Sequence, residues 1–219
     1  MPDRFAEVDR WIARHLLPAD PILDEVLAAN ARAGLPPIDV SPLQGAFLAL
    51  LCHVVGARHV LEVGTLGGYS AIWMARALAD GGRLVTIEAD PRHAEVARAN
   101  FARADVVRRV DLRVGRALEV LPQLVDEGHA FDLAFIDADK ANNPAYADWA
   151  ATLVRPGGLV LVDNVVREGR ILDEADDSPD LEGIRGLYAV MRMDGRFEAT
   201  VLQTVGIKGW DGLMIARRR

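Results

Sequence analysis

The most constraining feature of this chain is a regular alternation of short apolar segments with longer amphipathic ones through its middle. The apolar segments have strand length and the intervening segments have helical period. We predict strands at 59–63, 83–88, 110–114, 131–137 and 157–163, and helices near 69–79, 91–104, 116–126 and 144–154. Because such strand–helix alternation forms a parallel sheet with right-handed crossovers, the sequence predicts an α/β fold.

The two ends of the chain differ from this pattern. Residues 5–33 have helical apolar spacing broken by Pro18 and Pro21, which predicts two amphipathic helices. A third helix begins at Pro42, with Ser41 as its cap, and runs to about Val55. Because residues 1–56 precede the first strand, we expect them to cover the sheet or a partner subunit.

The C-terminal part begins with a helix near 180–193 and continues with two strand patterns, Arg196–Val205 and Asp211–Arg217. Two successive strands without a crossover helix predict an antiparallel hairpin that closes one edge of the sheet. The sequence has no internal repeat and no linker, so we expect a single domain over residues 1–219.

Composition limits the classes of function. A net charge of −7 and a pI near 5.2 disfavour a general nucleic-acid surface, which needs a basic face. Cys52 is the only cysteine, so no intramolecular disulfide can form and we expect a cytoplasmic protein. The N-terminus has no apolar signal core, and no uncharged run approaches the roughly 20 residues that span a bilayer, so we expect no membrane association.

A glycine-rich loop follows the first predicted strand. In open α/β sheets ligands bind at this position, past the carboxyl end of a strand. Gly64, Gly67 and Gly68 allow positive φ and close approach of a ligand to the backbone. The next helix begins near Tyr69 or Ser70, where free N–H groups can bind a carboxylate.

Two carboxylates indicate which ligand this loop takes. Glu88 ends the second strand, where it can accept hydrogen bonds from a ribose diol. Dinucleotide enzymes also have an acidic residue there, so Glu88 alone does not distinguish the two ligands. Glu62 lies before a Gly-x-x-Gly-Gly pattern rather than Gly-x-Gly-x-x-Gly; it would repel a pyrophosphate and attract the ammonium of a methionyl group. This favours S-adenosylmethionine over a dinucleotide. A glycine-rich turn without any ligand is the alternative.

A second group of polar residues follows two later strands. Asp137 ends one apolar run and Asp163-Asn164 end the next, so neighbouring strands would bring two carboxylates and an amide together. Such oxygen donors suit Mg²⁺, which could also chelate a vicinal diphenol and acidify its hydroxyls. Lys140, whose pKa a nearby cation would lower, could then take the phenolic proton. The alternative is an exposed Asp139–Lys140 pair and a simple Asp-Asn turn.

With these motifs the chain resembles the class I, cation-dependent O-methyltransferases, which include catechol and caffeoyl-CoA O-methyltransferases and bacterial relatives. The resemblance runs from about Ser41 to the end. It rests on Val60–Ser70, Thr86–Glu88, Phe135–Lys140, Pro156–Gly158, Asp163-Asn164 and Trp210–Leu213.

The resemblance implies a Rossmann-like seven-stranded sheet, mostly parallel with an antiparallel C-terminal strand, and helices on both faces. It implies that Asp137, Asp163 and Asn164 bind Mg²⁺ (or Mn²⁺ or Ca²⁺) and that Lys140, with Asp137, is catalytic. The cofactor-binding positions that it implies are Val40, Glu62, Gly64, Thr65, Gly68, Tyr69, Ser70, Glu88, Ala117 and Asp137. It also implies a homodimer and a small phenolic acceptor.

The chain departs from the plant members near the acceptor. It has Arg167 where they have an aromatic residue, and its first aromatic residue after Lys140 is Tyr146. Arg167, Glu168, Arg170 and the acidic loop 173–180 are expected to border the acceptor pocket, whose substrate the sequence leaves open. We predict methylation of a catechol-like hydroxyl; the alternatives are a non-catalytic S-adenosylmethionine-binding protein and a metal-independent small-molecule methyltransferase. Methylation of RNA or protein fits poorly with the acidic balance.

Overall fold

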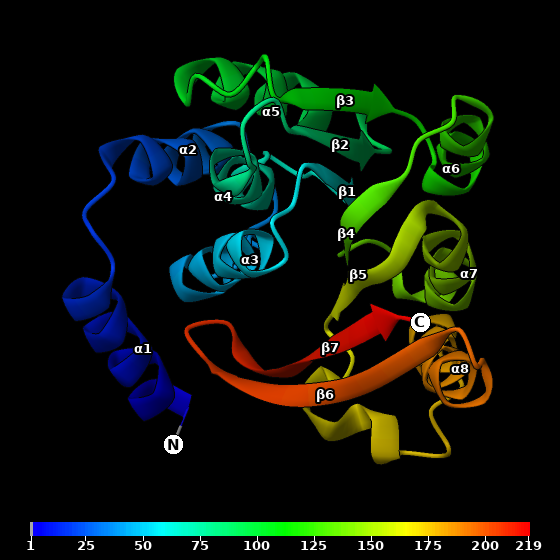
Figure 1. The fold of residues 1–219 in the computed structure, drawn as a ribbon. Helices are drawn as coiled ribbons and strands as arrows, with labels where there is room; N and C mark the ends of the chain where they lie inside the picture. Colours follow the sequence, from blue (N-terminus) through cyan, green and yellow to red (C-terminus); the bar gives the residue numbers. More distant parts are fainter. Residues whose placement is uncertain (1) are drawn as a thin grey trace.

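The structure, a computed structural model, describes residues 2–219, with side chains from Arg4 onward. These residues build one seven-stranded sheet with the order β3-β2-β1-β4-β5-β7-β6 (Figure 1). The strands are β1 (His59–Val63), β2 (Arg83–Glu88), β3 (Val110–Val114), β4 (Phe131–Ile136), β5 (Val154–Asp163), β6 (Phe197–Gly206) and β7 (Gly209–Arg218). The first five strands are parallel, whereas β7 runs antiparallel between β5 and β6. The predicted fold class is therefore confirmed.

The helices cover both faces of this sheet. They are α1 (Pro2–Leu16), α2 (Pro21–Arg32), α3 (Pro42–Val54), α4 (Tyr69–Ala77), α5 (Pro91–Arg103), α6 (Ala117–Asp126), α7 (Asn143–Leu153) and α8 (Pro179–Met193). One apolar core lies under α6, α7 and α8, and the other under α2 to α5 (Figure 1). Neighbouring residues of β1 face different cores: Leu61 and Val63 pack in the first and Val60 in the second, as in a strand buried on both sides.

The predicted Ser41 cap forms, and it fixes where α3 begins. Ser41 Oγ accepts a hydrogen bond from the backbone N–H of Gln44 at 3.1 Å, with Pro42 in the first turn of α3. Helix α1 packs against β6 and β7 rather than the sheet centre, and the N–H of Ile207 in the hairpin turn donates to Asp9 at 3.0 Å. The front helices thus reach both ends of the sheet.

Some element boundaries differ from the prediction. Strand β5 begins at Val154, before Pro156, because Val154 pairs with Phe131 across a shift in register. Two short 3₁₀ segments, η1 (Lys140–Asn142) and η2 (Arg167–Leu172), were not predicted. Segments of three and six residues are too short to show an apolar period in the sequence.

The chain reverses its direction of winding at β1, which lies between β2 and β4. At such a switch point the helices leave toward opposite faces, and a crevice opens past the carboxyl ends of the strands. No helix within residues 2–219 combines the length and the apolar character needed to cross a membrane.

Candidate active site

A cavity of about 480 Å³ opens at the carboxyl ends of β1, β2, β4 and β5. Most of the residues predicted to bind the cofactor or metal line it: Val40, Gly64, Thr65, Tyr69, Ser70, Glu88, Ala117, Asp137, Lys140 and Asn164. Glu62, Gly68 and Asp163 lie directly behind this lining. The fold therefore gathers residues from across the chain at one crevice.

The loop after β1 is placed by a close backbone contact. Gly64 has φ +97°, and a Cβ atom there would lie 2.1 Å from the carbonyl oxygen of Asp137. The N–H of Asp137 also donates to Val63 O at 2.9 Å. Glycine at position 64 is therefore what allows the glycine loop to lie beside the end of β4.

Glu88 holds the same loop from the β2 side. Its Oε2 accepts hydrogen bonds from the N–H groups of Thr65 at 3.1 Å and Leu66 at 2.7 Å. Its Oε1 accepts from the N–H of Asp90 at 2.9 Å, and His93 Nδ1 lies 3.6 Å away. Glu88 thus stabilises the loop in addition to facing the cavity, where its predicted role toward a ribose stays a prediction.

Glu62 is fully buried beneath the loop. Ser70 Oγ donates to its Oε1 at 2.6 Å and Thr86 Oγ1 donates to its Oε2 at 2.5 Å. Burial raises the pKa of Glu62 to about 8, since the two hydroxyl donors only partly offset the loss of water and the charges of Asp137 and Glu88 add to the rise. An incoming cation would favour its charged form.

Helix α4 begins at the loop without a side-chain cap. Gly68 is its N-cap with φ +84°, and Tyr69 and Ser70 of its first turn line the cavity. The first-turn N–H groups therefore point to a position where a carboxylate can accept them. Behind the loop, Asn100 Nδ2 donates to Gly67 O at 2.8 Å and fixes it to α5.

The other end of the cavity carries the predicted metal and base residues. Register pairs Ile136 with Val162, so Asp137 and Asp163 leave the sheet side by side. Lys140 is only 6% exposed, and its Nζ donates to Asp137 Oδ1 at 2.8 Å. The alternative of an exposed Asp139–Lys140 pair is therefore wrong.

Asp163 is nearly buried between polar partners. Gln44 Nε2 donates to its Oδ2 at 2.6 Å, and the N–H of Asn164 donates to its Oδ1 at 2.8 Å. Burial raises the pKa of Asp163 above its usual range, with the negative charge of Asp137 as the next cause. Two carboxylates that repel each other beside an amide form an oxygen donor set that fits a hard divalent cation. Within residues 2–219 no three His, Cys, Asp or Glu side chains cluster as metal ligands, so the amide would have to serve as the third donor.

Several residues of the site escaped the sequence analysis. Gln44 contacts Asp163 across 119 positions of sequence, and no local pattern indicates that contact. Ile38, Asp39 and His93 line the cofactor end of the cavity. Tyr146, singled out only as a departure, lines the acceptor end and donates to Asp139 Oδ1. The sequence did offer one indication of Tyr146, because it is an aromatic residue in the first turn of the helix that follows Lys140.

The sheet order, the glycine loop and the polar crevice together define a class I methyltransferase fold. Residues 15–219 match the model of the O-methyltransferase family. The chain is 50% identical to a catechol O-methyltransferase of Mycobacterium tuberculosis, over 96% of this chain and 94% of that protein. It is 47% identical to a catechol O-methyltransferase of Niastella koreensis, over 97% and 96%.

Among solved structures, an O-methyltransferase from Bacillus cereus in complex with S-adenosylhomocysteine superposes with a TM-score of 0.99. It is 50% identical, with 100% of both chains covered. This chain belongs to the O-methyltransferase family. The dinucleotide enzyme weighed from the loop pattern is thereby excluded.

Proposed function

We propose that this protein transfers a methyl group from S-adenosylmethionine to one hydroxyl of a vicinal diphenol, with a divalent cation bound beside the acceptor. The observation that carries the proposal is the hydrogen bond of the buried Lys140 to Asp137, beside Asp163 and Asn164 and at the same cavity as the glycine loop. The relatives named as catechol O-methyltransferases support the acceptor class, and the S-adenosylhomocysteine complex supports the donor.

The glycine-loop end of the cavity would bind the donor. The first-turn N–H groups of α4 suit its carboxylate, and Glu62 suits its ammonium directly or through water. Glu88 retains lone pairs for the ribose hydroxyls after accepting from Thr65 and Leu66. Val40 and Ala117 supply apolar walls.

The cation would be held by Asp137, Asp163 and Asn164. Gln44 would orient Asp163 through the hydrogen bond that it donates to Oδ2. When bound, such a cation lowers the pKa of a coordinated hydroxyl and orients the acceptor. Lys140 would take the proton of that hydroxyl, and the hydrogen bond from its Nζ to Asp137 Oδ1 supports this role by holding the amine at the cation site.

The chemistry that we assign to the residues is a direct displacement. Lys140 would accept the phenolic proton through its nitrogen lone pair while one of its N–H groups still donates to Asp137. The phenolate oxygen bonds to the methyl carbon, and the carbon–sulfur bond breaks with its electron pair left on sulfur. The products are the methyl ether, S-adenosylhomocysteine and a protonated Lys140. Alignment supplies much of the acceleration.

The test is methyl transfer from labelled S-adenosylmethionine to catechol, first with Mg²⁺ and then with EDTA. We expect turnover to stop with chelator and to return with metal. Asp163→Ala should abolish turnover while donor binding persists, with Asp126→Ala on the exposed end of α6 as the control. A turnover rate that EDTA does not change would support the metal-independent enzyme. Donor binding without turnover of any diphenol would support the non-catalytic protein.

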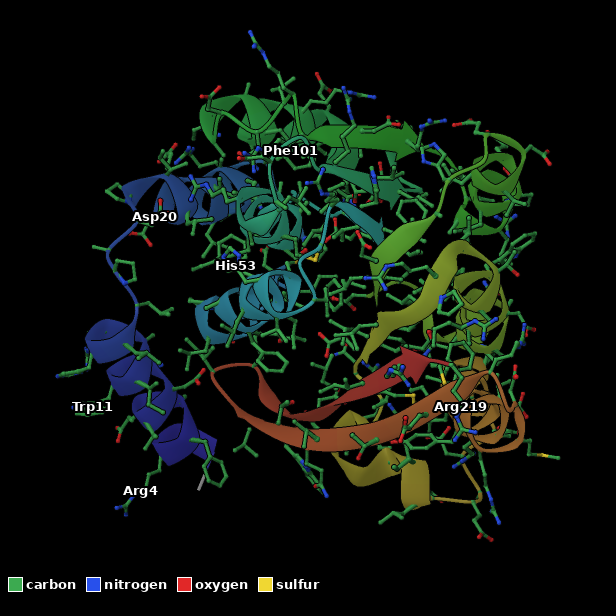
Figure 2. All side chains as sticks on the ribbon, viewed as in Figure 1. Arg4, Trp11, Asp20, His53, Phe101 and Arg219 are labelled. Atoms are coloured by element: carbon green, nitrogen blue, oxygen red, sulfur yellow. The ribbon has the colours of Figure 1, made fainter. Side chains whose placement is uncertain are left out.

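We also propose that the protein is a homodimer. Phe5, Val8 and Trp11 on α1 are each 43% to 55% exposed, and Leu50 and Val54 on α3 are exposed at 57% and 73%. Helices α1 and α3 contact each other, and Trp11 lies on the side of α1 turned away from the sheet (Figure 2). Large apolar surfaces of this kind mark interfaces.

Light scattering checks this proposal. A mass near twice 23.8 kDa is expected, and Val54→Asp should shift it toward the monomer. A monomeric wild-type protein would contradict it.

We further propose that residues 1–219 act as one domain, and that the protein works in the cytoplasm. The first rests on the packing of α1 to α3 against the sheet and its helices, and the second on the composition, with its lone and buried Cys52.

A further inference from the structure

The acceptor end of the cavity contains one cation without a close partner. Arg167 lines the cavity beyond Asn164, together with Tyr146 and Asp180. Its nearest carboxylate oxygen, Asp180 Oδ2, lies 3.8 Å from Nη2, beyond hydrogen-bond distance. Among the described residues no side-chain hydrogen bond involves the guanidinium of Arg167, so its five donors are available to a ligand.

Two other arginines, Arg170 and Arg185, donate hydrogen bonds to the acidic loop 173–180. Arg170 Nη2 donates to Asp176 Oδ2 at 2.7 Å. Arg185 Nη1 donates to Asp176 O at 2.8 Å, and its Nη2 donates to Asp173 O. Neither Arg170 nor Arg185 lines the cavity. Arg167 therefore differs from its neighbours in both position and pairing.

The backbone around Arg167 is held in an unfavourable conformation. Arg167 and Glu168 both have φ +54°, a region that costs an ordinary residue about 1–2 kcal/mol. Asp211 Oδ1 enforces it by accepting from the N–H groups of Val166 and Arg167, each at 2.9 Å. Strain that the surroundings enforce in this way is typical of functional sites.

The carboxylates of the cavity are already engaged, except one. Asp137 accepts from Lys140, Asp139 accepts from Tyr146, and Glu88 accepts from the glycine loop. Asp180 alone faces Arg167 loosely; its side chain is 52% exposed, whereas that of Arg167 is 33% exposed. Among the described charged side chains at this end, only the Asp180 carboxylate and the Arg167 guanidinium lack a hydrogen-bond partner, and the guanidinium, with five donors, is the more buried of the two.

We infer that Arg167 binds a carboxylate on the acceptor, and that the preferred acceptor is a vicinal diphenol with a carboxylate on the ring or on a short side chain. A guanidinium forms two parallel hydrogen bonds with a carboxylate, and Asp180, at 3.8 Å, is the carboxylate that the acceptor would displace. The inference rests on the proposed function, since it assigns a substrate class to the same site.

The experiment compares three acceptors: 3,4-dihydroxybenzoate, catechol and dopamine. For wild type we expect the highest kcat/KM with the carboxylate. Arg167→Met should lower the ratio of kcat/KM for dihydroxybenzoate over catechol about 10- to 100-fold, the usual range for a lost charge-assisted bond. Arg167→Lys should restore part of it, since the charge remains and the fork is lost.

Two further variants sharpen the comparison. Asp180→Asn frees Arg167 and should lower KM for dihydroxybenzoate. Arg170→Met, matched in charge and side-chain length but outside the cavity, should leave the ratio unchanged. A preference for dopamine that Asp180→Asn reduces would overturn the inference in favour of a cationic acceptor. An unchanged ratio in Arg167→Met would also overturn it. Catechol turnover by the wild type reports on the proposed function separately.

Discussion

The two ends of the cavity are built in different ways. At the donor end the glycine loop makes close backbone contacts and is held by hydrogen bonds to Glu88, while the buried Glu62 accepts from Ser70 in the first turn of α4. At the acceptor end the walls are side chains on 3₁₀ segments and a helix start, among them Arg167, Tyr146 and Asp180. The donor end therefore tolerates little change, whereas the acceptor end can vary without loss of the fold.

This difference matches the chemistry proposed for each end. A single donor molecule needs one fixed site, and a buried network with few exposed atoms provides it. Acceptors differ among related enzymes, and exposed side chains on short segments can change their specificity independently. Each prediction below changes a residue at one of these two ends or a residue that supports one of them.

The largest effect is expected at Gly64. Gly64→Ala would place Cβ 2.1 Å from Asp137 O, so the loop or the end of β4 must move, and both donor binding and turnover should be lost. The control is Gly81→Ala: its φ of +75° imposes a similar conformational cost, about 1–2 kcal/mol, but no atom lies within 4 Å. Calorimetric titration measures the affinity of both variants for S-adenosylhomocysteine. Wild-type affinity in Gly64→Ala would contradict the statement that the donor end tolerates little change.

The next largest effect is expected at Lys140. Lys140→Ala should lower turnover about 10²- to 10⁴-fold, the range for a positioned general base, with donor affinity close to wild type. Lys140→Arg keeps an N–H donor for Asp137 but cannot accept a proton at neutral pH, so it should also be slow. Single-turnover kinetics give the rate of the chemical step. Near-normal turnover in Lys140→Ala would mean that the hydroxyl ionises without this base.

The same division decides what the sequence could predict. The parallel strands follow from apolar runs, and the glycine loop follows from residue type, because both are local signals. The resemblance to a family implied a seven-stranded sheet with an antiparallel C-terminal strand, but the β3-β2-β1-β4-β5-β7-β6 order is known only from the structure, since strand order depends on contacts distant in sequence.

The acceptor end was less predictable for the same reason. The conformation of Arg167 depends on Asp211, 44 positions later, and the orientation of Asp163 depends on Gln44, 119 positions earlier. Neither contact leaves a local period or motif. The sequence predicted that Arg167 borders the pocket. Only the structure shows that its guanidinium has no close partner, whereas those of Arg170 and Arg185 form hydrogen bonds.

A smaller effect is expected from Glu62, and it appears in stability. Because the pKa of Glu62 is raised from 4.5 to about 8, the folded protein keeps a proton that the unfolded chain releases as pH rises. The ligand-free wild type should therefore lose stability between about pH 5 and 8, by at most about 1.4 kcal/mol per pH unit from this group.

Glu62→Gln removes this proton linkage. The free energy of unfolding of the variant minus that of wild type should rise with pH over that window, measured by urea denaturation at several pH values. Glu119→Gln, an exposed glutamate of α6, is the control and should show a difference that is flat with pH. A flat difference for Glu62→Gln would mean that Glu62 is ionised in the folded protein.

The smallest effect is expected at Asp211, and it separates the two ends most directly. Asp211→Ala removes the acceptor for the N–H groups of Val166 and Arg167, so the strained segment should relax and move the guanidinium. We expect KM for the acceptor to rise about 10-fold, equivalent to about 1.4 kcal/mol. Affinity for S-adenosylhomocysteine should be unchanged, because no atom of Asp211 lines the cavity. Asp211→Asn retains Oδ1 as an acceptor and should be milder. Equal losses in donor and acceptor binding would show that the two ends are mechanically one unit.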